Sequence, residues 1–441
     1  MEFNGVVRAW GHSFIWTEEH WTSERMAPLK VSYDELAHDC YTILKDIKDP
    51  KAPAGKRDMY ALLRDNADTH PRLKEMWEEI NTVPDWVDWD QIQRGQDVFY
   101  RYLGANLVGL TFQSLLGGMG AARVVETLAR TGGFSTKVAR HRLLETTQHI
   151  LQSTQSLDAI QPGGVGFASS VRVRLLHSAV RERIMKMAAQ RPDYFDLENW
   201  GVPINDIDQA GTIGTFCSTL VFVSLPRQGI YPSDQESKDY IALWRYIGYI
   251  LGAPTDFFET PSKARAIMES LLLYEVQPSD MSKVMANNII KCLQDQPPTY
   301  SSGDMLTVSA RWMNGRELSD QLGLANPSYY YWALMAGQCL FFMALDYSHR
   351  MIPWLDRRKI QASRDFMQQA LIEGKDGLKG EKSLFQFRYI PEYSTVTELG
   401  KEESTKRHGS AEWRNLQTLL AAGAFMFFTA YSVHRVAKLV F

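Results

Sequence analysis

The stretch from Phe167 to Arg191 constrains this chain more than any other part of it. It contains no glycine or proline, and Pro192 follows it directly, so it predicts one long helix that ends at the proline. His177 lies near the middle of this helix. At about 100° per residue, three apolar residues fall within about 60° of it: Val173, Val180 and Ile184. The histidine is therefore predicted to face the interior.

Two arginines, Arg174 and Arg181, lie on the other side of His177 around the helix. An imidazole in an apolar stripe beside two guanidinium groups suits a haem, because imidazole ligates iron, apolar side chains cover the macrocycle and arginines meet the propionates. The alternative is a core histidine bonded to a backbone carbonyl beside a solvated basic edge. From this helix alone, the alternative is favoured.

Composition narrows the class of protein. Hydrophobic residues at 45% and charged residues at 22% are ordinary for a globular chain of 441 residues. A net charge of −3 argues against a nucleic-acid partner. The 12% aromatic content fits a protein that encloses a large apolar ligand, and equally a large core. The four cysteines form no CxxC or CxxCH motif, which indicates a reducing compartment and no covalent haem attachment.

Helical segments separated by proline- and glycine-marked turns predict an all-α fold, a single large multi-helix domain. Residues 1–30 are expected to be irregular aromatic packing. The segment Thr212–Leu225 is β-branched and could be a strand, but its neighbours favour a buried helix. Thr260-Pro261 predicts a helix start. Gly118-Met119-Gly120 lacks both the third glycine and the preceding strand of a nucleotide-binding fingerprint, so that function is rejected.

We divide the chain into an N-terminal aromatic-rich extension and linker (1–56), a central domain (57–350) and a C-terminal extension (351–441). The last part contains Leu416–Val433, which is uncharged for 18 residues and is followed by basic residues. A membrane-associated helix and a buried core helix are both consistent with this segment. No signal peptide is visible, which favours an intracellular protein.

Two further groups of polar residues are candidates for chemistry. A helix at 136–157 places Arg142, Glu145, Thr146 and His149 on one face, which is either a solvated face or part of a site. Glu126 is the one acidic residue between Leu103 and Leu128, and a carboxylate beside a cavity can act as a base.

At these residues the sequence resembles a known family. Glu126, the following TLARTGGF, Arg142-x-x-Glu145-Thr146 and His177 within VRVRLLHSAVRERI occur in the order of the catalytic domain shared by latex clearing proteins (bacterial rubber oxygenases) and fungal MpaB-type endoplasmic-reticulum oxygenases. The segments NWGVPINDIDQAGTIGTF and LWRYIGYILGAP are also similar to that family. The resemblance covers roughly residues 57–347.

The resemblance implies an all-α fold around a non-covalent b-type haem (haem b), with His177 as the proximal iron ligand and metal-binding residue. Arg174, Arg181, Val173 and Val180 would contact the cofactor. Arg142, Thr146 and Glu145 would lie on the distal side, and Glu126 would be the base. The implied partners are dioxygen and an unsaturated apolar substrate whose carbon–carbon double bond is cleaved. The implied location is the cytoplasm or the endoplasmic-reticulum membrane.

One residue differs from the motif of the rubber oxygenases. They carry a lysine that can cap the iron, and here Glu145 occupies that position. A lysine ligand at this position is therefore excluded, and a small prenylated or terpenoid molecule is favoured over polyisoprene.

Other motifs are missing. A di-iron bundle needs two Glu-x-x-His pairs, and only Glu35–His38 is found. The zinc motif His-Glu-x-x-His and the serine hydrolase motif Gly-x-Ser-x-Gly are absent. The remaining alternative from another class is a non-catalytic haem- or lipid-binding protein with the same pocket.

Overall fold

The structure is a computed structural model. It describes residues 5–48, 57–131, 134, 136–297, 299–374, 377–380, 382–385 and 399–400, together with residues 412–413, 416–417, 420, 424 and 431.

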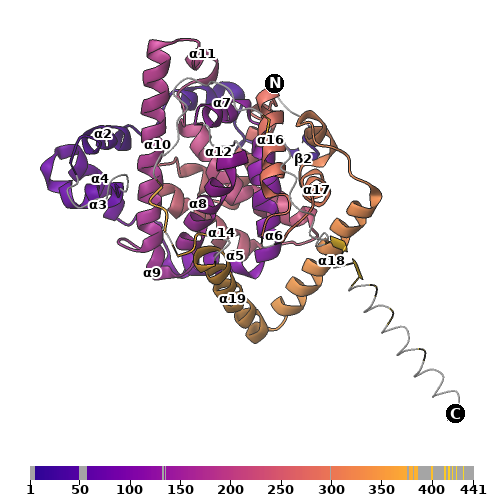
Figure 1. The fold of residues 1–441 in the computed structure, drawn as a ribbon. Helices are drawn as coiled ribbons and strands as arrows, with labels where there is room; N and C mark the ends of the chain where they lie inside the picture. Colours follow the sequence, from indigo (N-terminus) through magenta and orange to yellow (C-terminus); the bar gives the residue numbers. More distant parts are fainter. Residues whose placement is uncertain are drawn as a thin grey trace.

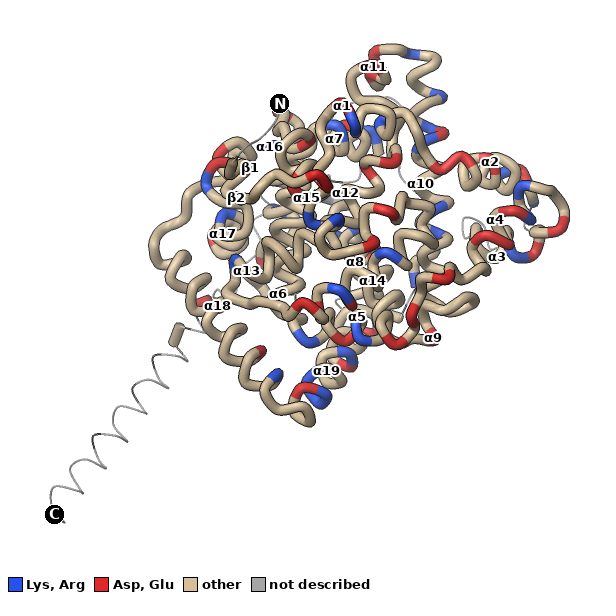
Figure 2. Tube along the Cα trace, turned by 180° about the vertical axis from the view of Figure 1, so that it is seen from behind, with Lys and Arg blue, Asp and Glu red and all other residues tan. Residues whose placement is uncertain are grey.

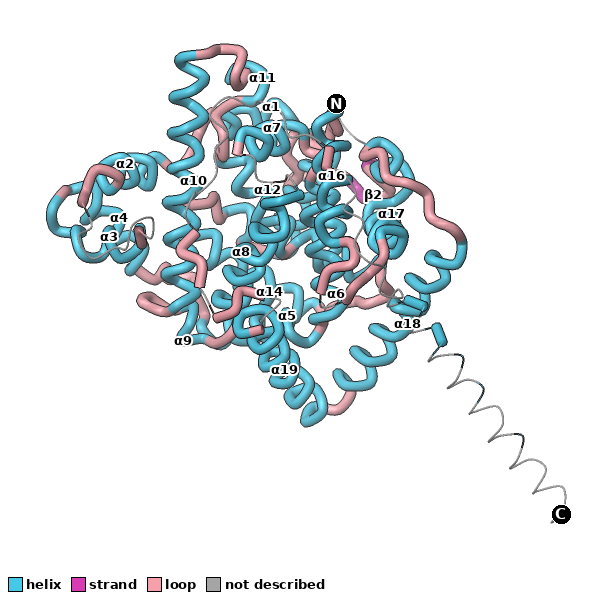
Figure 3. The backbone as a smooth tube through the Cα atoms, viewed as in Figure 1, coloured by secondary structure: helices cyan, strands magenta, loops and turns pink. Residues whose placement is uncertain are grey.

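The described chain is all-α apart from one short hairpin (Figures 1 and 3). Its first half contains β1 (Val6–Ala9), β2 (His12–Ile15), α1 (Ser23–Met26), η1 (Ala27–Lys30), α2 (Glu35–Leu44), α3 (Met59–Asn66), η2 (Ala67–Thr69), α4 (Pro71–Asn81), α5 (Trp89–Arg101), α6 (Leu103–Val108), the π-helix η3 (Gly109–Gly117), α7 (Ala122–Arg130), α8 (Thr136–Thr154), α9 (Leu157–Ile160), α10 (Val165–Gln190) and α11 (Leu197–Trp200).

The second half contains α12 (Asp206–Phe216), the π-helix η4 (Leu220–Ser224), α13 (Leu225–Arg227), α14 (Asp234–Ile250), η5 (Asp256–Phe258), α15 (Pro261–Tyr274), α16 (Asp280–Leu293), α17 (Gly303–Gln321), α18 (Tyr329–Arg350), α19 (Pro353–Met367) and the π-helix η6 (Gln368–Glu373).

The core is organised around α5, α14 and α10. α5 and α14 make the most extensive helix contact in the molecule. They approach so closely that a Cβ on Gly95 would lie 2.3 Å from the carbonyl oxygen of Asp239. α10 runs along one side of this pair and separates it from α2, α3 and α4, whereas α18 and α19 form a V on the opposite side (Figure 1).

Several sequence-based predictions are confirmed. The all-α class is correct, and the predicted His177 helix is α10, which ends one residue before Arg191. Thr260 caps α15, because its side chain accepts a hydrogen bond from the Lys263 amide and Pro261 is the first helical residue.

Two predictions need correction. Residues 1–30 are not irregular throughout, because β1 and β2 form an antiparallel hairpin. Its turn residues Trp10 and Gly11 both have positive φ, which matches the right-handed twist of the strands. The strand alternative for Thr212–Leu225 is wrong, since the segment continues α12 and forms η4 and the start of α13.

A buried carboxylate attaches the hairpin region to α15. Glu269 accepts hydrogen bonds from His12 Nε2 (2.8 Å), His20 Nε2 (3.0 Å) and Arg265 Nε (2.9 Å). The Thr17 amide donates to Nδ1 of His20 (3.0 Å), which leaves Nε2 as the protonated nitrogen that donates to Glu269. Although burial acts to raise the pKa of Glu269, these hydrogen bonds lower it to about 2.

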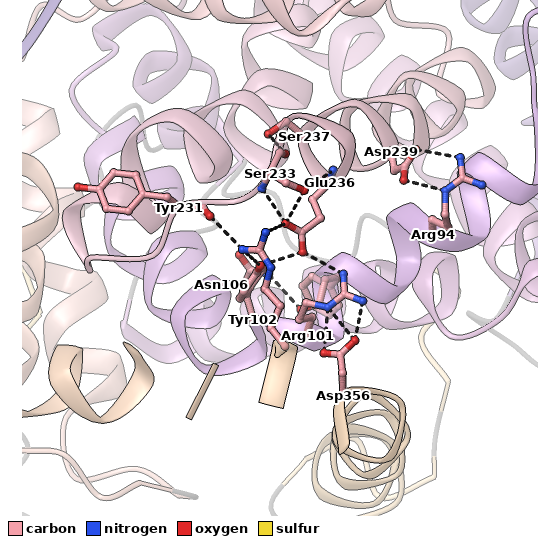
Figure 4. Close-up of polar contacts among 12 residues, drawn as sticks. Arg94, Arg101, Tyr102, Asn106, Tyr231, Ser233, Glu236, Ser237, Asp239 and Asp356 are labelled. Atoms are coloured by element: carbon pink, nitrogen blue, oxygen red, sulfur yellow. Dashed lines mark hydrogen bonds and ion pairs between the residues drawn. The ribbon is translucent and has the colours of Figure 1, made fainter. Parts of the chain in front are cut away.

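A second polar network joins α5, α14, α18 and α19 (Figure 4). Glu236 caps α14 by bonding the Ser233 amide (2.7 Å), and it also accepts from Arg101 Nη1 (3.0 Å) and the Tyr102 hydroxyl (2.8 Å). Arg350 of α18 reaches its second oxygen at 3.1 Å. Arg101 also pairs with Asp356 of α19, with Nη2 2.7 Å from Oδ2. Glu236 therefore compensates the charges of Arg101 on α5 and Arg350 on α18.

None of the helices in the described ranges is long and apolar enough to cross a membrane. The predicted helix Leu416–Val433 falls outside the described residues apart from 416–417, 420, 424 and 431.

We expect Glu236→Ala to lower the free energy of unfolding by about 3 kcal/mol, because it removes the carboxylate of Arg350 and one of the two carboxylates of Arg101 from a largely buried network. The matched control is Asp280→Ala, whose side chain is 98% exposed and pairs only with Lys283. That change should cost less than about 0.5 kcal/mol. Urea unfolding followed by circular dichroism measures both. Equal losses in the two variants would contradict a structural role for the network.

Candidate functional site

The candidate site lies on the antiparallel hairpin formed by α8 and α10. Two contacts set its register. His149 Nδ1 lies 3.1 Å from Ser169 Oγ, and a Cβ on Gly166 would lie 2.4 Å from the carbonyl oxygen of Gln152. The residue numbers in each pair add up to 318. Arg142 and His177 thus lie on two helices that pack against each other.

Burial changes along α8. Residues 148–154 are all buried, whereas residues 141–147 are all at least partly exposed. On α10, Val173, Leu176 and His177 are half-buried. The apolar residues near these positions belong to different parts of the core: Leu144 and Val173 pack against the main cluster, and Leu143 and Leu176 against two smaller ones.

A small gap lies beside α12, which carries one of the family-like segments. Gly214 is buried, yet a Cβ placed there would meet no atom within 4 Å. At Gly211, about one turn earlier, a Cβ would meet Leu271 Cδ1 at 3.5 Å, which is ordinary contact. The gap is therefore local to Gly214.

His177 has the chemistry of an available ligand. Burial lowers the pKa of His177 to about 4, and the nearby Arg181 acts in the same direction. The imidazole is therefore neutral at pH 7 and keeps a lone pair for a metal ion. Its Nδ1 is buried, and neither ring nitrogen has a hydrogen-bond partner among the described residues. The satisfied core histidine considered from the sequence is not what the structure contains.

His149 is a second buried imidazole close to the first. Burial lowers its pKa to about 4, and His177 contributes to the shift. Its Nδ1 contacts Ser169, whereas its Nε2 is buried without a partner in the described part of the chain. Phe385 packs edge-on against this ring, with the centroids 6.3 Å apart.

The two arginines predicted beside a propionate have protein partners in the structure. Arg174 bonds Asp34 through Nε (2.6 Å) and Nη2 (3.0 Å) and bonds Glu79 through Nη1 (2.8 Å). Three of its nitrogens are thus taken by carboxylates. Arg181 donates to the Pro203 and Ile204 carbonyl oxygens and lies over the Tyr33 ring. An anionic ligand would have to displace these groups.

The valines of the same helix are separated. Val180 is buried in a small cluster with Ile184, Tyr194 and Phe195, and Val173 packs against the main core. Contact of Val173 and Val180 with a cofactor stays a prediction.

The predicted polar face of α8 is divided between the interior and the C-terminal extension. Arg142 donates from Nη1 to Thr131 Oγ1 (3.1 Å), and burial lowers its pKa. Glu145 accepts a hydrogen bond from the Ser383 hydroxyl and lies 3.4 Å from His141 Nε2. Thr146 is exposed. Arg142 is thus the one strongly desolvated cation on this face of α8.

Residues 382–385, which we call the strap, cross this face of α8. The Ser383 amide donates to Gln148 Oε1 (2.8 Å), and Gln148 Nε2 donates back to the Ser383 carbonyl oxygen (3.0 Å). Sequence analysis missed the strap. The only available signal was Gln148 itself, one turn after Glu145 on the same face.

Glu126 lies on α7 and pairs with Arg130, whose Nη1 is 2.7 Å from Oε2. Arg130 Nε also donates to the Tyr194 carbonyl oxygen (2.7 Å). α7 packs on α16, which packs on α8. The structure therefore brings Glu126 to the same side of the molecule as α8.

A buried charge cluster beside Glu126 was not predicted. Arg123, one turn earlier on α7, has Nη2 3.0 Å from Asp208 Oδ1 and 3.1 Å from Glu275 Oε2. Burial raises the pKa of Asp208 to about 6, against the opposing effect of Arg123. Asp208 belongs to the NWGVPINDIDQAGTIGTF segment, so this cluster joins two of the family-like segments.

The described residues contain no group of three or more His, Cys, Asp or Glu side chains arranged to hold a metal ion. A buried imidazole nitrogen without a partner in the described chain, on His177, fits a metal ion whose other ligands come from a porphyrin.

Fold and site together define an all-helical protein with an internal imidazole site. The chain belongs to the family described as ER-bound oxygenase mpaB/B'/rubber oxygenase, catalytic domain, whose model matches residues 54–345. This confirms the resemblance seen in the motifs, and it places the chain in a family of oxygenases.

Individual relatives agree with this assignment. The rubber oxygenase of Streptomyces sp. (strain K30) is 22% identical over 263 residues, which cover 57% of this chain and 60% of that protein. Aurantioclavine synthase of Penicillium expansum is 61% identical over 33 residues, 8% of this chain and 7% of that one. The chain thus matches less than two thirds of the length of either relative.

A solved structure shares the fold. The structure of latex clearing protein in the closed state has a TM-score of 0.57 at 18% identity and covers 78% of this chain and 92% of its own. This similarity supports the helical architecture.

We expect Gln148→Ala to release the strap, because it removes both hydrogen bonds to the Ser383 backbone. Two such bonds contribute on the order of 1–2 kcal/mol, so amide hydrogen exchange at residues 382–385 should become about tenfold faster or more. The matched control is Thr147→Ala, since Thr147 bonds only the Leu143 carbonyl oxygen of its own helix. Unchanged exchange in the Gln148 variant would show that the strap is held by other contacts.

Proposed function

We propose that the protein is a haem b-dependent oxygenase that uses dioxygen to cleave or oxidise a carbon–carbon double bond of a prenylated, terpenoid or other unsaturated apolar substrate. The observation that carries the proposal is His177 of α10, a neutral imidazole whose buried Nδ1 has no hydrogen-bond partner among the described residues. Membership of an oxygenase family supports the reaction class.

When bound, a b-type haem supplies the redox chemistry that activates dioxygen. His177 would hold the haem iron through its imidazole. Leu144 and Val173, which pack against the same core cluster, would cover part of the macrocycle and exclude water from the reacting region, which would strengthen electrostatic interactions there. Such apolar side chains suit a hydrocarbon substrate and offer little to a charged one.

Arg142 is proposed to stabilise negative charge on bound oxygen or substrate. It lies on α8, which packs against the His177 helix, and its described hydrogen bond is to Thr131, a neutral group. A desolvated guanidinium acts strongly on charge that develops nearby. Thr146 is proposed as a hydroxyl donor on the same face. Glu145 is tied to Ser383 and cannot replace the missing lysine ligand without breaking that bond.

Glu126 is proposed as the base that moves a proton to or from the substrate. Its Oε2 lies 2.7 Å from Arg130 Nη1, so the carboxylate has a fixed position on α7. This role would require the substrate to reach α7, where Arg123 and Asp208 would form the next layer of the site.

We expect His177→Ala to give a folded protein that retains much less haem and has a shifted Soret band, because one axial bond is lost. Absorption spectroscopy of the purified, haem-reconstituted protein measures this. His149→Ala is the matched control, since it removes the other buried neutral imidazole and should keep most of the haem.

Two outcomes would change this assignment. Full haem content with an unshifted spectrum in the His177 variant, and loss in the His149 variant, would move the ligand to His149. A wild-type protein that stays colourless after reconstitution would refute haem dependence altogether.

We expect Arg142→Ala and Glu126→Gln to keep haem and to lose turnover by about a hundredfold or more, because both groups act on charge or protons in the transition state. Oxygen consumption with an added prenyl substrate measures turnover. Glu198→Gln, at an exposed position on α11, is the control. Unchanged turnover would remove both residues from the mechanism, and a wild type that binds haem but consumes no oxygen with any such substrate would favour a non-catalytic binding protein.

A further inference from the structure

The junction of α18 and α19 exposes an unusual amount of apolar surface. Four consecutive residues at this corner, Met351, Ile352, Pro353 and Trp354, are all exposed, and the Met351 and Trp354 side chains are 81% and 57% accessible. We call them the α18–α19 corner. Such a contiguous apolar group on a soluble surface marks an interaction site.

The apolar surface continues from the corner along the outer face of α18. Leu340 and Phe341 are 64% and 60% exposed, and the small residues Ala333, Gly337 and Ala344, before and after them on the helix, are also exposed at helical spacing. The inner face of the same helix is used by the fold, since Met335, Cys339 and Asp346 are buried. The outer face is therefore not needed for the core.

Near the corner, the acidic residues are buried and two basic residues are exposed. The acidic residues Asp346 and Asp356 are buried and pair with Lys359 and Arg101. Arg357 and Arg358, next to the corner, are exposed. Along most of its length α18 carries no charged residue (Figure 2). The corner thus presents apolar side chains beside a pair of basic ones.

We propose that the α18–α19 corner docks this protein on the surface of a lipid bilayer that contains anionic headgroups. Trp354 and Met351 enter the boundary between headgroups and acyl chains, and Arg357 and Arg358 contact lipid phosphates. The corner projects from the body as the point of a V (Figures 1 and 3). A convex apolar point suits a deformable lipid surface, whereas a protein partner would need a matching groove.

This docking is peripheral. No helix in the described ranges is long and apolar enough to span a bilayer, so the contact is limited to the corner and the adjoining face of α18. The proposal is independent of the reaction proposed above, because it concerns a surface built from α18 and α19.

Co-sedimentation of the full chain with phosphatidylcholine vesicles, with and without phosphatidylserine, tests the proposal. We expect binding that is stronger with phosphatidylserine. The double variant Met351→Asp/Trp354→Asp should lower partitioning about tenfold or more on both vesicles, because it removes the inserted apolar area. Arg357→Glu/Arg358→Glu should lower it roughly fivefold per residue, on phosphatidylserine vesicles only.

Two variants control for general changes of the surface. Leu197→Asp replaces an exposed apolar residue of α11, and Arg316→Glu reverses an exposed charge of α17 whose side chain is 91% accessible. Both should bind like the wild type. All the substituted positions are exposed, so circular dichroism should show the same fold in each variant.

Three results would overturn the proposal. The wild type could fail to sediment with either vesicle. The corner variant could bind as well as the wild type, which would assign any membrane contact to another segment, including residues 416–433. The wild type could form a concentration-dependent dimer without vesicles that the corner variant does not form, and the surface would then be an interface between two copies of the chain.

Discussion

The architecture depends on ion pairs between the arginines of α10 and carboxylates from the N-terminal helices. A buried guanidinium is tolerated only when oxygen atoms replace its water. Arg172 pairs with Asp58, with Nη2 2.7 Å from Oδ2, and Arg174 pairs with Asp34 and Glu79. These carboxylates come from the start of α2, the start of α3 and the end of α4. The N-terminal helices are therefore held to α10 by charge pairing, and α10 can lie between them and the rest of the core.

The same helix carries the candidate ligand beside its arginines. At about 100° per residue, Arg174 and Arg181 lie within about 60° of His177, and both Arg181 and Asp34 are close enough to act on its pKa. Burial is the largest cause of the lowered pKa of His177, so the imidazole is neutral although charged groups lie near it. The same helix packs against α8 and α2. Structural ion pairs and the candidate ligand therefore lie on neighbouring faces of one helix.

The C-terminal extension contacts both the core helices and the candidate site. Asp356 of α19 compensates Arg101 of α5, and Ser383 contacts Glu145 and Gln148 of α8. The boundary predicted at residue 350 separates segments that differ in sequence, but contacts join them in the folded chain. Ser383 donates a hydrogen bond to Glu145. Glu145, at the position expected to match the lysine of the rubber oxygenases, thus has a fixed partner.

Helix formation, helix ends and the facing of side chains could be predicted from the sequence, because backbone hydrogen bonds and capping act over a few neighbouring residues. This is why α10, the Thr260 cap and the inward position of His177 were predicted correctly, and why the ordered motifs were sufficient to indicate the family. The partners of those side chains could not be predicted. Arg174 and Asp34 are 140 residues apart, and Ser383 and Glu145 are 238 apart. Periodicity states which residues share a face, whereas only the packing of distant segments decides what covers that face.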